Sequence, residues 1–142
     1  MNSIYKHVKH SSMAAIALTM LAVSFFAVAA VIAAPAQNLT TLLSFDGSNG
    51  ADPVATLVQG FDGNYYGTTW AGGASNNGTV FKIRPQGTLT TLYNFCSQPN
   101  CTDGANPPAG LALATNGNFY GTTTDGGAYG FGTVFKITPK GS

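Results

Sequence analysis

The stretch GNFYGTTTDGGAYGFGTVFKI, residues 117–137, occurs twice in this chain, because GNYYGTTWAGGASNNGTVFKI at residues 63–83 is a near copy of it. Both copies keep the Gly-Thr-Thr run, the glycine pair and the closing Gly-Thr-Val-Phe-Lys-Ile. Internal similarity at a fixed period of roughly 50 residues is typical of repeat architectures. The chain is therefore expected to fold as copies of one small unit.

Each copy contains short runs with the composition of β-strands. LTTLLSF at residues 39–45 reappears as LTTLYNF at residues 89–95, and both combine threonine, leucine and aromatic residues between polar turn residues. The strands expected from this pattern cover residues 39–45, 55–58, 64–69, 78–83, 89–95, 110–114, 118–123 and 132–137.

Two of the expected strand connections are tight turns. Asp62-Gly63 and Asn116-Gly117 have the composition of type I′ hairpin turns, which need positive φ at both central positions. Gly67 lies inside the strand that follows the first of these turns. A glycine weakens a strand, so its presence predicts close approach by another backbone.

These patterns together predict an all-β domain over residues 37–142. Four short antiparallel strands in a unit of roughly 40 to 50 residues match the size of a β-propeller blade. The chain after its first 36 residues shows no helical periodicity and is rich in glycine. We expect two four-stranded antiparallel repeat units of the β-propeller-blade type, at about residues 39–88 and 89–142.

The first 36 residues have a different character. Lys6 and Lys9 precede an apolar run over residues 13–34, and Ala34-Pro35-Ala36 forms a small-residue exit. This order predicts an N-terminal signal helix, a secretory signal peptide over residues 1–36, and a secreted or cell-surface protein. Cleavage is expected after Ala36, with Ala33 or Ala34 as alternatives. A run of about 20 apolar residues also spans a bilayer, so a retained anchor is the alternative, and membrane contact is expected only in that case.

The side chains left after the leader exclude several classes of function. Both histidines lie in the leader, and the chain has no glutamate. The usual acid–base and nucleophile sets are therefore missing, and we expect no catalytic residues, no metal site and no cofactor. Asp103 and Asp125 are the pair left for a glycoside-hydrolase-like alternative. The few scattered cations form no basic stripe, so no nucleic-acid partner is expected.

Two further groups of residues attract attention. Cys96 and Cys101 are the chain's two cysteines, and in an exported protein such a close pair predicts a disulfide. Trp70, Tyr129 and Phe131 lie where strands give way to glycine-rich loops, and Asp125 lies nearby in sequence. Flat aromatic faces beside polar groups can hold a sugar or a peptide, and we take these four residues as the candidate ligand site. Packing between sheets is the alternative role for the aromatic rings.

The unit GNFYGTT…GG…GTVFKITP, followed by LTTLYNF, resembles the GloVer tandem repeats of exported bacterial proteins. The resemblance covers nearly all of the chain after the leader. It implies a secreted or surface repeat protein with a propeller-like fold and no assigned chemistry. Longer members carry many repeats, so a chain with two units is expected to be a short member or a piece of a longer one.

We therefore expect a non-catalytic exported extracellular or cell-surface repeat protein that acts as a binding or scaffold module for a polysaccharide or a surface protein. An oligomeric carbohydrate-binding β-propeller lectin is the alternative, and a fragment of a propeller hydrolase is the third hypothesis.

Propellers have four to eight blades, and two units cannot enclose a channel. The chain itself is therefore also an expected partner, in a cyclic homo-oligomer with a trimer as the favoured size. In that ring the first strand of each chain, residues 39–45, would pair with the last three strands of its neighbour.

Overall fold

The structure is a computed structural model that describes residues 37–142, so the predicted signal helix, the cleavage sites and the anchor alternative lie outside the described residues. Within residues 37–142 the chain forms two antiparallel sheets, of four and three strands, and one short 3-10 turn at Pro99–Cys101. The all-β prediction is confirmed. No helix in this part of the chain is both long and apolar enough to cross a membrane.

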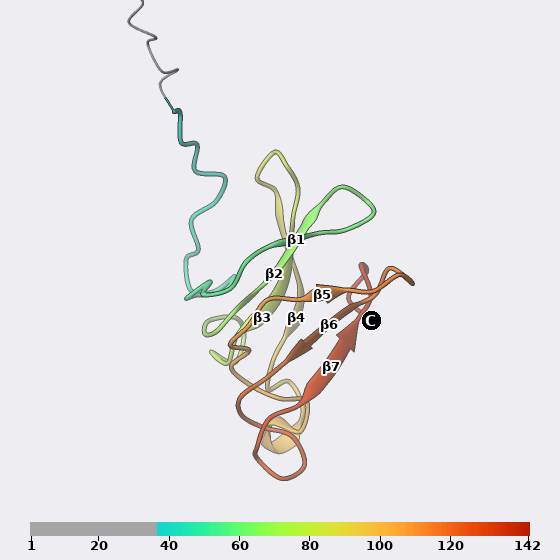
Figure 1. The fold of residues 1–142 in the computed structure, drawn as a ribbon. Helices are drawn as coiled ribbons and strands as arrows, with labels where there is room; N and C mark the ends of the chain where they lie inside the picture. Colours follow the sequence, from blue (N-terminus) through green and yellow to red (C-terminus); the bar gives the residue numbers. More distant parts are fainter. Residues whose placement is uncertain (1–36) are drawn as a thin grey trace, which may run out of the picture. The chain divides into compact units, whose positions relative to one another are not determined.

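The first sheet is a meander of four strands, each paired with the next along the chain (Figure 1). Its strands are β1 (Val58–Gln59), β2 (Tyr65–Thr69), β3 (Thr79–Ile83) and β4 (Leu89–Asn94). The second sheet repeats the first three of these strands.

The strands of the second sheet are β5 (Ala112–Leu113), β6 (Phe119–Thr122) and β7 (Val134–Ile137), again in sequential order. The pairing of β6 with β7 sets Gly121 opposite Phe135, as the pairing of β2 with β3 sets Gly67 opposite Phe81. The two units therefore share a register as well as a sequence.

The prediction of two four-stranded units is right for the first sheet and wrong for the second within the described residues. LTTLYNF was expected to open the second unit, but it forms β4 and closes the first sheet beside β3. The reason is a tight turn in which the Arg84 N–H donates to the Thr88 carbonyl at 3.0 Å and returns the chain along β3. A strand sequence does not by itself specify which sheet it joins.

The expected strand at residues 39–45 pairs with no strand of the described chain, and its expected pairing with a neighbouring copy stays a prediction. Its side chains nevertheless pack on the first sheet, where Phe45 meets Phe81 edge to face with ring centroids 5.2 Å apart. The segment therefore packs on the sheet as a strand would, but it makes no strand-to-strand backbone hydrogen bonds within the described chain.

The two predicted hairpins are confirmed, but their turn type differs from the prediction. Gly63 and Gly117 have φ values of 77° and 80°, whereas the Asp62 and Asn116 before them are not among the positive-φ residues. The Gly63 N–H donates to the Gly60 carbonyl at 3.0 Å. This is the three-residue connection with glycine in the left-handed position, which also matches the twist of the flanking strands.

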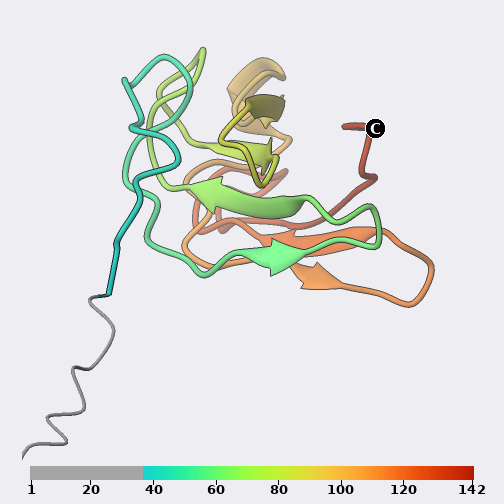
Figure 2. The ribbon, with the colours of Figure 1, turned by 90° about the horizontal axis from the view of Figure 1, so that it is seen from above.

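The core lies where the two sheets face each other, as Figure 2 shows for the strands seen from above. Tyr66 of β2 stacks on Phe119 of β6 with ring centroids 4.1 Å apart. Phe95, just after β4, meets Phe135 of β7 edge to face at 5.1 Å. The buried residues of this core are Tyr66, Val80, Phe95, Leu111, Phe119 and Ile137.

Gly67 is needed for space rather than for its φ angle. A Cβ atom at this position would lie 2.7 Å from both Leu57 Cδ2 and Phe81 Cζ. The prediction that another backbone approaches it is wrong, because side chains fill the place. Phe81 is buried, so it cannot move aside freely.

We predict that Gly67→Ala lowers the free energy of unfolding by about 1–3 kcal/mol, because the added methyl group overpacks this side of the sheet. Chemical denaturation followed by circular dichroism measures the effect. Thr90→Ala, an exposed change in β4, is the matched control and should stay within about 0.5 kcal/mol of the wild type. Equal stabilities for Gly67→Ala and the control would contradict this account.

Candidate functional site

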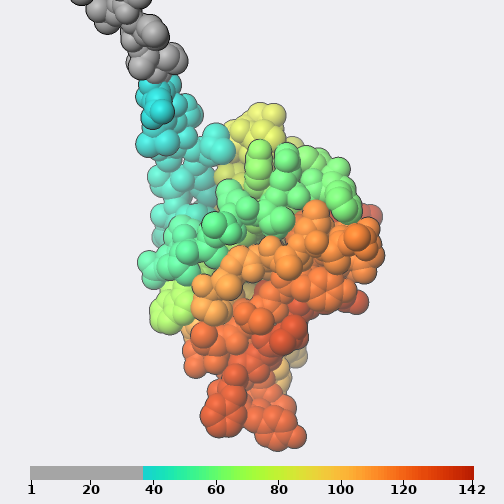
Figure 3. All heavy atoms as spheres, viewed as in Figure 1, coloured from blue at the N-terminus to red at the C-terminus, as the bar shows by residue number. Residues whose placement is uncertain are grey.

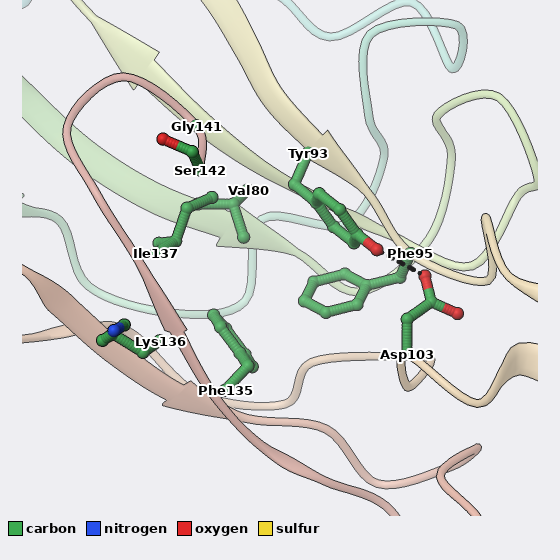
Figure 4. A pocket seen from close by; sticks show the side chains of 9 residues that line it. All are labelled: Val80, Tyr93, Phe95, Asp103, Phe135, Lys136, Ile137, Gly141 and Ser142. Atoms are coloured by element: carbon green, nitrogen blue, oxygen red, sulfur yellow. Dashed lines mark hydrogen bonds between the residues drawn. The ribbon is translucent and has the colours of Figure 1, made fainter.

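A cavity of about 280 Å³ lies between the end of the first sheet and β7 of the second (Figure 4). Tyr93 and Phe95 enter it from β4 and the residue beyond, and Phe135 and Ile137 enter it from β7. The remaining lining residues are Val80, Asp103, Lys136, Gly141 and Ser142. The wall is thus mostly apolar, with one carboxylate at its rim.

Asp103 is the one acidic side chain that lines this cavity, and it accepts several hydrogen bonds. Its Oδ2 accepts hydrogen bonds from the Tyr93 hydroxyl at 2.8 Å and from the Ser97 N–H and hydroxyl at 2.9 Å each. The Gln98 N–H donates to its Oδ1 at 3.2 Å. This carboxylate holds the loop after β4 in place, and its acceptor capacity is largely used for that purpose.

The same hydrogen bonds shift the pKa values of Asp103 and of Tyr93, which donates to it. Partial burial raises the pKa of Asp103, but the hydrogen bonds from Tyr93, Ser97 and Gln98 outweigh burial and hold the pKa below its ordinary value. Burial, assisted by the hydrogen bond to Asp103 and its charge, raises the pKa of Tyr93. Neither group is tuned to exchange a proton near neutral pH.

The same loop contains the predicted disulfide, which the structure forms between Cys96 and Cys101. Both cysteines and the intervening Asn100 have positive φ, at 58°, 51° and 56°. Residues other than glycine rarely adopt positive φ, so other interactions must hold this loop in its conformation. The disulfide and the Asp103 hydrogen bonds supply them.

A second cavity, of about 440 Å³, is the repeat copy of the first. Phe45, Phe81 and Ile83 line it at the places that Phe95, Phe135 and Ile137 take in the first cavity. The first cavity is bounded on one side by Val80 of the preceding sheet. No sheet precedes β1 in the described chain, so the second cavity has no such wall.

The predicted ligand residues lie elsewhere. Tyr129 and Phe131 lie in the β6–β7 loop, where their side chains are 89% and 91% exposed, and this loop projects at the bottom of Figure 3. Trp70 follows β2 and is 43% exposed. Core packing within one chain is thus wrong for Tyr129 and Phe131, and a ligand role for them stays a prediction.

Asp125 shares the β6–β7 loop with these two aromatic residues. Its carboxylate accepts a hydrogen bond from the Thr124 hydroxyl at 3.0 Å, and its backbone pairs with Ala105. Neither of the two cavities is lined by any of the four predicted residues. The structure therefore brings Tyr129, Phe131 and Asp125 onto one exposed loop and leaves Trp70 on the equivalent loop of the first sheet.

Sequence reasoning missed the Tyr93–Asp103 pair. The signal for it was a difference between the repeats, since Tyr93 stands where the first copy has Leu43 and Asp103 where it has Asn49. Both changes accompany the longer, cysteine-containing loop. In residues 37–142 no three His, Cys, Asp or Glu side chains gather at a distance suited to a metal ion.

The sequence model described as the Gloeobacter/Verrucomicrobia repeat matches residues 29–142, well over half of the chain. No curated protein matches the chain.

We predict that Asp103→Asn lowers the free energy of unfolding at pH 7 by about 1–2 kcal/mol, because a charged acceptor is lost at a partly exposed site. The folded pKa lies below the unfolded value of about 3.9, so the contribution is complete above that pH and is lost as the pH falls through the folded pKa. Urea unfolding at pH 7 and below pH 3 measures this.

Asp125→Asn is the matched control, because the carboxylate of Asp125 accepts one side-chain hydrogen bond instead of several. The gap between wild type and Asp103→Asn should narrow in acid. A gap of the same size at both pH values would show that the Asn side chain destabilises the loop for another reason, such as its shape.

Proposed function

This chain belongs to the Gloeobacter/Verrucomicrobia repeat family, and from that premise we propose that it is a non-catalytic exported repeat protein. It acts as a binding or scaffold module outside the cell or at the cell surface. Its two sheets are blades of the β-propeller type. The observation that carries the proposal is the face-to-face packing of two sheets of one design, with Tyr66 stacked on Phe119.

The use of the carboxylates supports a non-catalytic role. Asp46 accepts hydrogen bonds from the Ser48 hydroxyl and the Asn49 N–H within its own turn. Asp62 accepts from Tyr66, and Asp103 holds the loop after β4. A general acid or base needs a carboxyl group directed at a substrate, whereas these groups are directed at their own turns. The third hypothesis, a hydrolase pair of Asp103 and Asp125, therefore has less support.

The carbohydrate-binding alternative is favoured by one specific observation. Tyr129 and Phe131 expose most of their rings on a loop that also contains Asp125. Large exposed aromatic side chains beside a polar group are typical of sites that stack on a sugar ring. At the same places the first repeat has Ser75 and Asn77, so the aromatic pair is a property of one loop and not of the fold.

We predict that glycan binding, if it occurs, is lost in the double variant Tyr129→Ser with Phe131→Asn, which gives the second loop the residues of the first. A glycan array on the folded protein, followed by calorimetry on any sugar found, measures this. The thermal midpoint should change little, because both rings are exposed.

The matched control is Phe61→Thr, which removes another exposed ring and installs the residue that the second repeat has at the same place. Retained binding in the double variant would exclude this loop as the sugar site. An array without any glycan hit would leave the scaffold role and remove the lectin alternative.

Export is tested separately. The protein expressed with its leader is expected in the extracellular fraction with an N-terminus near Gln37, because the leader has a basic start, an apolar run and a small-residue exit. Mass spectrometry of the intact protein reads the terminus. Material that begins at Met1 and sediments with membranes would instead support the retained anchor.

A further inference from the structure

The outer face of the second sheet is the repeat copy of a face that is buried in the first sheet. In the first sheet Tyr66 and Val80 are fully buried against the second. Their equivalents Tyr120 and Val134 are 36% and 80% exposed. We propose that this face docks onto the first sheet of a second copy of the chain, head to tail, in the way that the two sheets pack within one chain.

On the first sheet, the face that would receive Tyr120 and Val134 of another copy contains the second cavity. The second cavity is lined by Tyr65, Phe81 and Ile83, the copies of Phe119, Phe135 and Ile137 that pack against the first sheet. Tyr120 of one copy would stack on Tyr65 of the next, as Tyr66 stacks on Phe119 within the chain. Val134 would supply the wall that Val80 gives the first cavity.

Two backbone segments lack, within residues 37–142, a strand partner that their repeat copies have. β7 pairs with β6 on one edge and with no described strand on the other, whereas its copy β3 is flanked by β4. Residues 40–45 are the repeat copy of residues 90–95, which include most of β4, and they have no strand partner in the described chain. A sheet edge with unpaired N–H and C=O groups is a ready site for an added strand.

Residues 40–45 also lie on their own unit as β4 lies on the next one. A Cβ at Gly87 would lie 2.5 Å from the Leu42 carbonyl oxygen, and a Cβ at Gly141 would lie 2.8 Å from the Leu92 carbonyl oxygen. Leu42 and Leu92 occupy the same place in the two copies. The segment is therefore already positioned as the last strand of a preceding sheet, and β7 of another copy would complete its ladder.

The existing ladder specifies the register of this contact. Val80 of β3 lies opposite Tyr93 of β4. Repeat equivalence then sets Val134 of one copy opposite Leu43 of the second copy. The occupant is thus a second copy of this chain, because its segment carries both the strand sequence and the packing face.

Hydrogen bonds also join the two sheets within one chain, and one of them cannot be repeated between two copies. The Thr68 hydroxyl donates to the Ala109 carbonyl at 2.9 Å, and Asn106 Nδ2 donates to the Trp70 carbonyl at 3.0 Å. The copy of Asn106 is Asp52, whose side chain lacks the N–H donor of the amide. The contact between copies is therefore expected to be weaker than the contact within the chain.

This proposal deepens the proposed function, since it rests on the blade-type repeat and names its partner. If the two sheets of residues 37–142 repeat this step, two to four copies would close a ring of four to eight blades, and a trimer is the expected size. The test is independent of export and of sugar binding. Light scattering on folded protein of residues 37–142 is expected to show such an oligomer.

Val134→Asp should convert the oligomer to a monomer, because the charge would be buried in the contact. Phe61→Asp, at an exposed residue outside the docking face, is the matched control and should stay oligomeric. Val134 is largely exposed in one chain, so circular dichroism should show both variants folded. A folded, monomeric wild type over a micromolar to millimolar range would overturn the proposal.

The register has its own test. Oxidation of the double variant Leu43→Cys with Val134→Cys should give covalently closed oligomers, whereas Leu43→Cys with Phe61→Cys should not. Cross-linking of the second pair alone would overturn the docking mode even if the protein is oligomeric. Asp52→Asn, which restores the donor, should tighten association by about 5-fold, and weaker association would contradict the assigned contact.

Discussion

The stacking of Tyr66 on Phe119 is the interaction on which the rest of the structure depends. Each sheet is small, its first strand has two residues, and neither sheet can bury an apolar face alone. The ring of Tyr66 is fully buried between the sheets, and burial of such a side chain contributes about 1.5–3 kcal/mol. The Tyr66 hydroxyl donates to Asp62 at 2.8 Å, so the same residue also fixes the first hairpin turn.

A second repeated interaction explains why the two copies share their Gly-Thr-Thr and Gly-Thr motifs. The hydroxyls of Thr69 and Thr79 lie 2.8 Å apart, and those of Thr123 and Thr133 lie 2.9 Å apart. In both pairs the later backbone N–H also donates to the earlier hydroxyl. These bonds close the base of each glycine-rich loop in the same way, although the residues within the two loops differ.

The sequence predicted the repeat, the all-β fold, the hairpins and the disulfide, because each of these depends on residues close together in the chain. The boundary between units that it placed before residue 89 does not match the sheets, because the pairing of β4 with β3 depends on the turn before the strand and on the free edge of β3. The Tyr93–Asp103 pair was missed for a similar reason. The loop folds back across the insertion, and only the fold brings these two side chains to 2.8 Å.

Comparison of the two copies distinguishes the residues that maintain the fold from those that are free to form a binding site. Tyr66, Val80 and Phe81 of the first sheet recur in the second as Tyr120, Val134 and Phe135. Positions that differ lie mostly in loops, where Tyr129 and Phe131 replace Ser75 and Asn77. A rigid repeated frame leaves loop residues free to vary without loss of stability, and binding residues concentrate on such loops. Self-association would then belong to the shared faces of the fold, and ligand choice to the loops, so the two properties could change independently.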